Sequence, residues 1–275
     1  MGSLAFVKGH GTENDFVLLP DPDGALDLTA EVVRALCDRR AGIGADGVLR
    51  VVRSENAADA VAMAAEATWF MDYRNADGSL AEMCGNGIRV YARFLVDEGL
   101  EQPGLLRIAT RDGVKVVRLG TAGDVTVDMG SATFPGPDEV KVRASGRTWS
   151  ATSVAVGNPH AVVMVDDLDE AGPLRDAPEV EPVFPDGVNV EFVVSRGERH
   201  IALRVHERGS GETRSCGTGA CAAVVAAARR DGVALPASYV VDVPGGRLEV
   251  TERADGHLEL TGPALLVARG DVLLA

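Results

Sequence analysis

Two cysteines occur where their thiols could take part in proton transfer. Cys84 and Cys216 each open a Cys-Gly-x-Gly run that leads into an apolar stretch with helical spacing. The free N–H groups and the positive dipole end of a helix N-terminus favour a thiolate, so we expect them to lower the cysteine pKa from about 8.5 toward neutrality. The same N–H groups can bind a carboxylate. The pattern therefore predicts two reactive thiols, each beside an anion site.

Two such thiols facing a common anion suit the inversion of an α-carbon. One thiolate would remove the α-proton from one face while the opposing thiol delivers a proton to the other. The helix N-termini would stabilise the charge that moves onto the carboxylate. Because the α-proton is very weakly acidic, exclusion of water would also have to contribute. The alternative is a pair of structural thiols, since free cysteine is often buried, but the repeated helix-start context favours catalysis.

The chain has two further cysteines, for which we predict a packing role. Cys37 lies on the apolar face of a helix predicted over residues 29–40, and Cys221 lies inside the helix that follows Cys216. Four cysteines in 275 residues do not make a disulfide framework, although oxidation can join opposed Cys84 and Cys216 in an inactive form. The spacing of Cys216 and Cys221, with no accompanying His pair, predicts no zinc site.

The elements that must position the thiols are predicted to be many short strands and a few helices. The helices after the two thiols are predicted to stop at Gly99 and Gly232, and the helix over residues 29–40 is capped by Thr29. Strand patterns separated by turn signals cover four segments, residues 105–129, 152–165, 188–206 and 238–261.

The two cysteine segments are similar to each other and lie nearly half the chain apart. Nine residues before each cysteine stands a polar residue that can face the same site, Asn75 in one segment and Glu207 in the other. We interpret this as an internal duplication; a helix-start motif shared by chance is the alternative.

The predicted fold class is α+β, with two similar domains. Each would be a curved, mostly antiparallel sheet around a central helix, with the active site in the cleft between the domains. The predicted domains are residues 1–130 and 131–263, because SATFPGPDE breaks the strand pattern near Gly130–Pro137. Whether the last strand, residues 264–275, returns to the first domain stays open.

The net charge and the lengths of the apolar runs exclude several classes of partner and indicate a location. A formal net charge of -14 argues against nucleic acid and against an anionic membrane surface as partners, but it permits an anionic substrate in a small pocket. No targeting segment is visible, and the longest apolar run, residues 216–228, is too short to span a bilayer. We therefore expect a cytoplasmic protein.

Six blocks of the sequence, in order, resemble the diaminopimelate epimerase family. The thiol segments NADGSLAEMCGNGIR and ERGSGETRSCGTGACA are similar to the family's first and second cysteine motifs. The other blocks are ENDF around Asn14, GIGADG at residues 42–47, GNPH at residues 157–160 and DGVNVEF around Asn189. The resemblance covers residues 5–270. A single Cys-Gly-x-Gly run would be weak evidence, whereas six blocks in order are specific.

The resemblance implies a role for each matching residue. Cys84 and Cys216 would be the two acid/base thiols, and Arg208 would pair with the distal carboxylate of the substrate, where a bidentate guanidinium fits well. His160 and Glu207 would tune the thiols or orient the substrate. The proximal carboxylate would meet backbone amides of Gly85, Asn86, Gly217 and Thr218. The pocket would be lined by Asn14, Asn75, Asn158, Asn189, Glu207 and Arg208.

The activity implied by the resemblance is the interconversion of LL- and meso-2,6-diaminopimelate, on the bacterial route to lysine and cell-wall peptide. The family needs neither pyridoxal phosphate nor a metal, so we expect no cofactor. The resemblance also implies a homodimer. The expected partner is the small diamino dicarboxylic acid, with no nucleic acid and no membrane.

One position departs from the family pattern. Many members have glutamine after the aspartate of the GADG-like block, whereas this chain has Gly47 after Asp46. If this position contacts substrate or shapes its loop, that detail differs here.

Other functions predict other sequence features. Proline racemases and hydroxyproline epimerases use a similar cysteine pair, but their first motif typically has histidine where this chain has Asn86. A related group of isomerases lacks the cysteine pair. A thiol redox protein would have a Cys-x-x-Cys motif, which is absent, and a binding protein would have lost a cysteine or the glycines after it. Preference among related diamino acids would be tested at Asn189 and Arg208.

Overall fold

The computed structural model describes residues 3–135 and 139–273, and the chain divides into two compact units. Unit 1 comprises Met1–Val127 and Gly262–Ala275, and unit 2 comprises Asp128–Thr261. Residues 136–138, within the predicted boundary segment, lie outside the described residues. Each unit is built mostly of strands with one buried helix, which agrees with the predicted α+β class.

Unit 1 is a mixed set of short strands. β2 runs parallel to β3 and β4 parallel to β5, while β1 with β2, β3 with β4, and β5 with β6 are antiparallel. Gly113, at a φ of 83°, supplies the left-handed residue that the predicted turn between β5 and β6 needs. The strands are β1 (Ser3–Gly11), β2 (Asn14–Pro20), β3 (Gly47–Arg53), β4 (Trp69–Asn75), β5 (Gly104–Thr110), β6 (Gly113–Leu119), β18 (Leu265–Leu273) and β7 (Val125–Ser131), which continues into unit 2.

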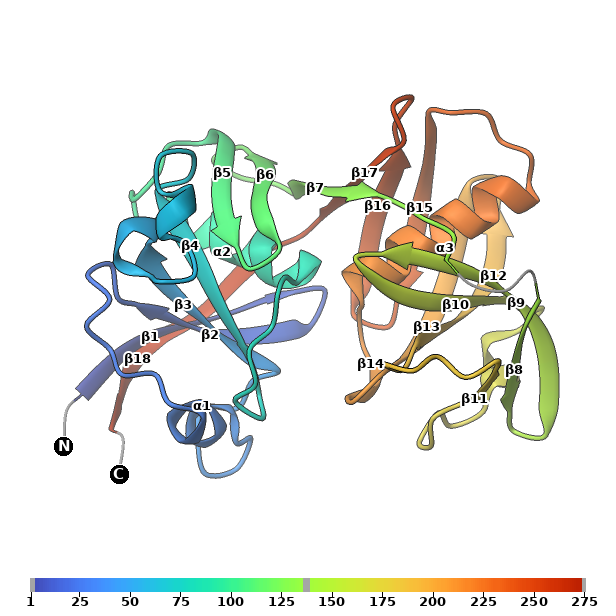
Figure 1. Ribbon diagram of the computed structural model, residues 1–275, viewed down its shortest axis with the longest axis horizontal. Helices are drawn as coiled ribbons and strands as arrows, with labels where there is room; N and C mark the ends of the chain where they lie inside the picture. Colours follow the sequence, from blue (N-terminus) through green and yellow to red (C-terminus); the bar gives the residue numbers. More distant parts are fainter. Residues whose placement is uncertain (1–2, 136–138, 274–275) are drawn as a thin grey trace. The chain divides into compact units, whose positions relative to one another are not determined.

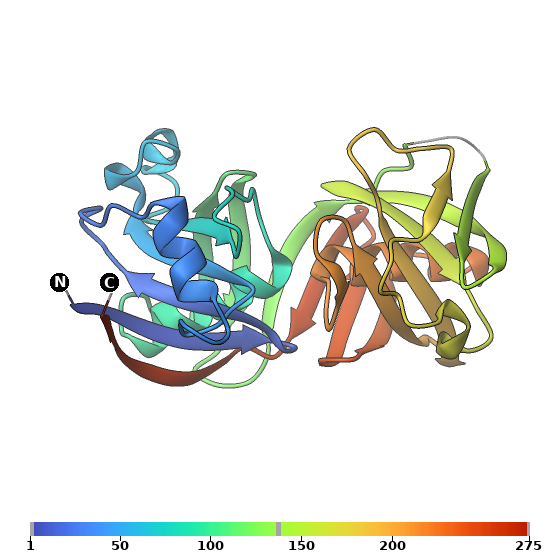
Figure 2. The same cartoon turned by 90° about the horizontal axis from the view of Figure 1, so that it is seen from below.

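The last strand, β18, belongs to unit 1, which the sequence alone left open. β18 pairs antiparallel with β1, from Ser3 opposite Leu273 to His10 opposite Leu265. The two strands lie side by side in both views (Figures 1 and 2). The chain therefore returns to unit 1 after completing unit 2. Residues 274–275 of the predicted strand lie outside the described residues.

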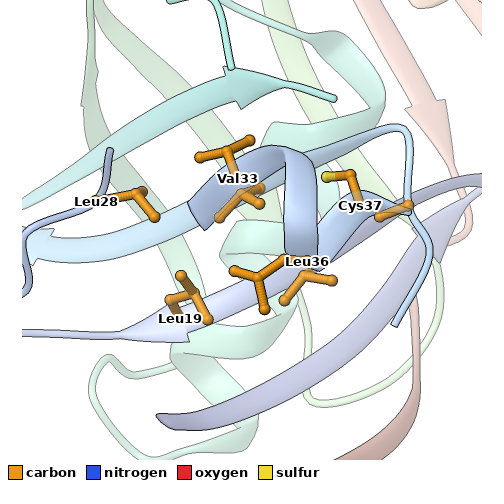
Figure 3. Packing of buried hydrophobic residues seen from close by; sticks show 8 residues of the cluster. Leu19, Leu28, Val33, Leu36 and Cys37 are labelled. Atoms are coloured by element: carbon orange, nitrogen blue, oxygen red, sulfur yellow. The ribbon is translucent and has the colours of Figure 1, made fainter. Parts of the chain in front are cut away.

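Helix α1 (Ala30–Cys37) covers one face of unit 1 (Figure 2). The predicted cap is present, because the Thr29 hydroxyl accepts a hydrogen bond from the Val32 N–H. The apolar face of α1 packs on Leu19 and Leu28 (Figure 3), and the prediction that Cys37 packs in the core is confirmed. Burial raises the pKa of the Cys37 thiol to about 11, so this cysteine is an unreactive thiol at neutral pH.

Unit 2 has a comparable mixture of strands. β10 runs parallel to β12 and β13 parallel to β15. The strand pattern predicted over residues 152–165 is divided at Gly157, whose φ of 77° reverses the chain between β9 and β10. The strands are β8 (Val140–Ala144), β9 (Arg147–Val156), β10 (Asn158–Met164), β11 (Glu179–Glu181), β12 (Asn189–Gly197), β13 (His200–Glu207), β14 (Gly211–Thr213), β15 (Ala237–Val243), β16 (Gly246–Glu252) and β17 (His257–Gly262). Three single-turn 3₁₀ helices, Ser54–Asn56, Val61–Met63 and Leu168–Ala171, complete the described elements.

Each unit encloses one buried helix, α2 (Gly85–Asp97) in unit 1 and α3 (Gly217–Arg230) in unit 2 (Figure 1). Both are buried on nearly every side at their N-terminal ends, because strands of their own unit surround them. They end close to the predicted stops, Gly99 and Gly232, which have φ values of 69° and 64°. No helix in the described part of the chain is long and apolar enough to cross a membrane.

Candidate active site

Cys84 is the N-cap residue of α2 and the centre of a half-site in unit 1. Its sulfur accepts a hydrogen bond from the Gly87 N–H at 3.3 Å, and it lies 3.6 Å from the Asn14 side-chain oxygen. The Asn86 amide donates to the same Asn14 oxygen at 3.2 Å. The structure thus brings together three of the predicted site residues around a half-buried thiol at a helix N-terminus.

The side chain of Asn14 is held by a charged cluster behind it. Its amide nitrogen donates to Asp46 at 2.8 Å, which directs its oxygen toward Cys84 and Asn86. Neighbouring Asp15 binds both Arg39 and Lys8 at 2.7 Å. Burial by itself raises the pKa of Asp15, but the hydrogen bonds and charges of these two cations outweigh it and lower the pKa to about 2. Asp15 is therefore a fixed anion at all physiological pH values.

Asn75 and Gly47 lie opposite each other at the ends of β4 and β3. The Asn75 amide donates to the Ser79 hydroxyl at 3.0 Å, so its observed bond lies within its own turn and not at the thiol. A Cβ on Gly47 would lie 2.6 Å from the Arg74 carbonyl oxygen and 2.7 Å from the Tyr73 ring. The glutamine common at this position in relatives cannot fit here unless Tyr73 and the neighbouring backbone move.

Cys216 is the N-cap residue of α3 and the centre of a second half-site, in unit 2. Its sulfur accepts from the Gly219 N–H at 3.4 Å, and it lies 3.4 Å from the Thr218 hydroxyl and 4.0 Å from the Asn189 amide nitrogen. Asn189 is oriented by the Arg208 N–H, which donates to its side-chain oxygen at 3.0 Å. These four predicted site residues therefore gather around one buried thiol.

The electrostatic surroundings of Cys216 correct one expectation. Burial, followed by the charges of Glu207 and Glu191, raises the pKa of the Cys216 thiol well above its usual value. The Gly219 N–H and the Thr218 hydroxyl lower that pKa, but by less. The expectation that the helix N-terminus brings the pKa of this thiol toward neutrality is wrong for Cys216, because burial and two carboxylates outweigh the hydrogen bonds at the helix start.

Glu207 lies beside Cys216 at the end of β13. It accepts hydrogen bonds from the Thr213 hydroxyl and from Cys216, and both lower its pKa. Burial has the larger effect, so the pKa of Glu207 is raised overall. Because this carboxyl is hydrogen-bonded to the thiol, it is placed to exchange a proton with it.

A second carboxylate, Glu191, was not predicted as a site residue. It is fully buried on β12, and one of its oxygens lies 2.7 Å from His160 Nδ1. The other imidazole nitrogen of His160 lies 3.0 Å from the Asn158 side-chain oxygen. His160 therefore lies between Asn158 and Glu191, and Glu191 is one of the two carboxylates whose charges act on Cys216. A signal was present in the strand NVEFVV, where Glu191 shares one face with Asn189 inside an otherwise apolar run.

Gly85, Gly217 and the Arg208 side chain complete the set of predicted site residues. Gly85 and Gly217 are the first residues of α2 and α3, where N–H groups have no partner within the helix. The Arg208 side chain is exposed and donates to the Asp186 carbonyl at 2.9 Å. Within residues 3–135 and 139–273, no three His, Cys, Asp or Glu side chains are grouped so as to hold a metal ion.

Comparison with known sequences gives one family. The sequence model described as diaminopimelate epimerase matches residues 6–135 and 152–267. A diaminopimelate epimerase of Streptomyces coelicolor is 62% identical over 275 residues, covering 98% of this chain and 95% of the relative. That of Thermobifida fusca is 50% identical and covers 99% of each chain.

Comparison with solved structures shows the same fold at much lower identity. A phenazine biosynthesis protein of the PhzF family from Bacillus anthracis has a TM-score of 0.70 at 17% identity, covering 100% of both chains. A hydroxyproline epimerase from Agrobacterium vitis, with bound trans-4-OH-L-proline, has a TM-score of 0.67 at 16% identity and covers 98% of this chain and 91% of its own. At these identities the likeness concerns the fold alone.

Proposed function

The chain belongs to the diaminopimelate epimerase family, and we propose that it interconverts LL- and meso-2,6-diaminopimelate with Cys84 and Cys216 as paired acid and base. One observation carries the proposal. Each thiol is the N-cap of a buried helix and accepts a backbone N–H, from Gly87 in one half-site and from Gly219 in the other.

The proposed reaction consists of two proton transfers. A thiolate takes the α-hydrogen as a proton, and the electron pair of the broken C–H bond spreads onto the substrate carboxylate. The second thiol gives its proton to the opposite face of the α-carbon and becomes the thiolate. Nothing is oxidised or reduced, and the two thiols exchange roles in the reverse direction. Helix N-terminal N–H groups stabilise the carboxylate as its charge grows.

The substrate contacts follow the half-sites. We propose that the proximal carboxylate binds N–H groups at the starts of α2 and α3, where Gly85 and Gly217 permit close approach. Arg208 is proposed to leave its carbonyl partner and pair with the distal carboxylate. The remaining proposed contacts are Asn14, Asn75, Asn86, Asn158, Asn189, Glu207 and Thr218, with His160 in support.

Turnover in D₂O tests the reaction and the substrate together. With LL-2,6-diaminopimelate and no added cofactor, the wild-type protein is expected to form the meso isomer with deuterium at the inverted α-carbon, because the incoming proton comes from a thiol that exchanges with solvent. Mass spectrometry and chiral chromatography measure both. Proline and trans-4-OH-L-proline are run in parallel. Activity on proline or trans-4-OH-L-proline alone would refute diaminopimelate as the substrate but would remain consistent with the two-thiol proton transfer. No exchange with any of the three compounds would refute the proposed epimerase function.

A homodimer is part of the same proposal. β18 pairs with β1, its one strand partner among the described residues. Its Leu265, Val267 and Leu273 side chains are 52%, 56% and 72% exposed. An edge strand with apolar side chains is a surface on which a second copy can add a strand. Light scattering is expected to give twice the 28.7 kDa chain mass, and Val267→Asp to give the single-chain mass; a wild-type monomer would contradict this. The cytoplasmic location stays a prediction.

A further inference from the structure

The two half-sites are built on matching strand pairs with unlike residues. In unit 1 the parallel strands β2 and β3 place Phe16 beside Gly47. In unit 2 the parallel strands β10 and β12 place His160 beside Asn189. Phe16 and His160 are each the third residue of their strand, and both strands begin with asparagine. The position held by an apolar ring in unit 1 is thus held by an imidazole in unit 2.

The strands paired with β2 and β10, which are β3 and β12, differ in the same way, with an apolar residue in unit 1 and a polar one in unit 2. Leu49 and Glu191 are each the third residue of β3 and β12. We call Phe16 with Leu49, and His160 with Glu191, the underlying pairs of the two half-sites. All four side chains have 0% exposure. One underlying pair is therefore purely apolar, while the other is titratable.

Both underlying pairs lie against the first turn of the helix that carries the thiol. A Cβ on Gly87 of α2 would lie 3.4 Å from Phe16 and 3.5 Å from Leu49, which is ordinary contact. A Cβ on Gly219 of α3 would lie 2.6 Å from the Glu191 carboxylate. The carboxylate thus occupies the place, beside the Cys216 sulfur, that hydrocarbon occupies beside Cys84.

The hydrogen bonds of the titratable pair fix its protons. The Asn158 side-chain oxygen accepts a hydrogen bond from His160 Nε2, so this nitrogen carries a proton. One further proton lies between the second nitrogen and Glu191, 2.7 Å apart. The second Glu191 oxygen has no hydrogen-bond partner among the described residues. The Glu191 oxygen that contacts His160 is the one that lies 2.6 Å from the place of a Gly219 Cβ. The negative end of the pair therefore lies at the N-terminus of α3, where it offsets the favourable effect of the helix dipole on a Cys216 thiolate.

We propose that the buried Glu191–His160 pair keeps Cys216 protonated in the resting enzyme, so that Cys216 begins a turnover as the proton donor. This rests on the proposed epimerase function. The groups that face Cys216 are Glu191 from β12, Glu207 from β13 and, behind Glu191, His160 from β10. Glu207 accepts a hydrogen bond from the thiol itself, whereas Glu191 is held in place by His160. Glu191 is thus a positioning residue that sets which thiol is the acid.

The proposal determines which thiol acts as the acid and which as the base at the start of a turnover. With Cys216 holding a proton, the thiolate in the resting form is Cys84. The substrate isomer that presents its α-proton to Cys84 meets an enzyme ready to react. The other isomer needs the proton to have moved first.

Alkylation of each thiol as a function of pH tests the proposal. Iodoacetamide is added to the reduced full-length protein from pH 6 to pH 11, and labelling of the Cys84 and Cys216 peptides is quantified by mass spectrometry. In Glu191→Gln we expect the Cys216 midpoint to fall by about one pH unit, which is about tenfold more thiolate below the midpoint. The Cys84 midpoint is expected to stay where it is in the wild type. The alkaline limb of kcat/KM is expected to move to lower pH by the same amount.

Two further variants make the result specific. Glu249→Gln removes an exposed carboxylate of the same unit and is expected to leave the Cys216 midpoint unchanged. The double variant His160→Phe, Glu191→Leu introduces the underlying pair of unit 1 into unit 2. It keeps the site packed if Glu191→Gln does not fold. This double variant is also expected to lower the Cys216 midpoint. An unchanged or raised Cys216 midpoint in folded protein that still inverts substrate would overturn this inference alone. A wild type that neither inverts nor exchanges substrate would instead overturn the proposed function.

Discussion

Replacing Cys84 or Cys216 with alanine is expected to lower the rate of inversion at the substrate α-carbon by about 10³-fold or more. Each variant keeps one helix N-terminus and one thiol, but inversion needs a proton removed from one face and another added to the opposite face. Chiral chromatography of diaminopimelate after incubation with each variant measures the loss. Both single variants should lose inversion to a similar extent, because neither thiol can perform both transfers.

The matched control is Cys37→Ala, which removes the buried thiol at the end of α1, remote in sequence from both motifs. It is expected to keep inversion within a few-fold of the wild type. Circular dichroism shows whether each variant is folded. A folded Cys84→Ala or Cys216→Ala protein that inverts substrate at the wild-type rate would show that the two-thiol mechanism is incorrect.

Asp72→Ala is expected to destabilise unit 1 by about 3 kcal/mol, because it leaves partly buried guanidinium groups without their buried carboxylate. Asp72 is 3% exposed and binds Arg74 at 3.0 Å and Arg111 at 2.6 Å, with Arg50 at 3.7 Å. Arg111 also donates to the carbonyl oxygens of Tyr73 and Ala81. The cluster therefore holds both ends of the segment that leads from β4 to the Cys84 half-site.

Urea unfolding in a Trp149→Phe background measures this effect, since Trp69 then reports on unit 1 alone. Glu66→Ala is the control, because Glu66 forms an ion pair with Arg107 in which both side chains are about half exposed. Such pairs contribute about 0–1 kcal/mol. Equal losses in the two variants would contradict a special role for the buried cluster.

The pH dependence of stability gives a second measure of Asp72. Burial raises its pKa, but hydrogen bonds and charges from Arg74 and Arg111 outweigh burial, so the pKa lies below the ordinary value of 3.8. A carboxyl with a lowered folded-state pKa contributes its full stabilisation above the unfolded value and loses it as the pH falls through the lowered one. The acid loss of stability below about pH 4 should therefore be shallower in Asp72→Asn than in the wild type.

Much of the fold follows from local sequence patterns. Thr29, Gly99 and Gly232 mark helix ends because capping and left-handed residues act within one turn of the backbone. The alternation and turn signals of residues 105–129 become β5, β6 and β7 for the same reason. The Cys-Gly-x-Gly runs become helix starts because a thiol and two small residues meet the needs of an N-terminus.

The chemistry around the thiols was less predictable. The helix start alone predicts a lowered pKa for Cys216. The contrary result depends first on burial and then on Glu207 and Glu191, which lie 9 and 25 residues earlier in the sequence. The pairing of β10 with β12 brings His160 and Glu191 together, and this contact holds the Glu191 carboxylate in place at the N-terminus of α3. Local patterns contain no information on such pairing. The same holds for Gly47, whose lack of a side chain makes room for the Tyr73 ring.

The pairing of β18 with β1 also bears on the rate at which each unit can fold. Unit 2 is one continuous segment, residues 128–261, whereas unit 1 is made of two segments that unit 2 separates in the sequence. Joining β1 to β18 therefore requires the closure of a loop that contains the whole of unit 2. Contacts between residues so distant in the sequence slow folding, because the entropy of closing the loop is lost before the contact forms. We therefore expect unit 2, with the Cys216 half-site, to fold faster than unit 1.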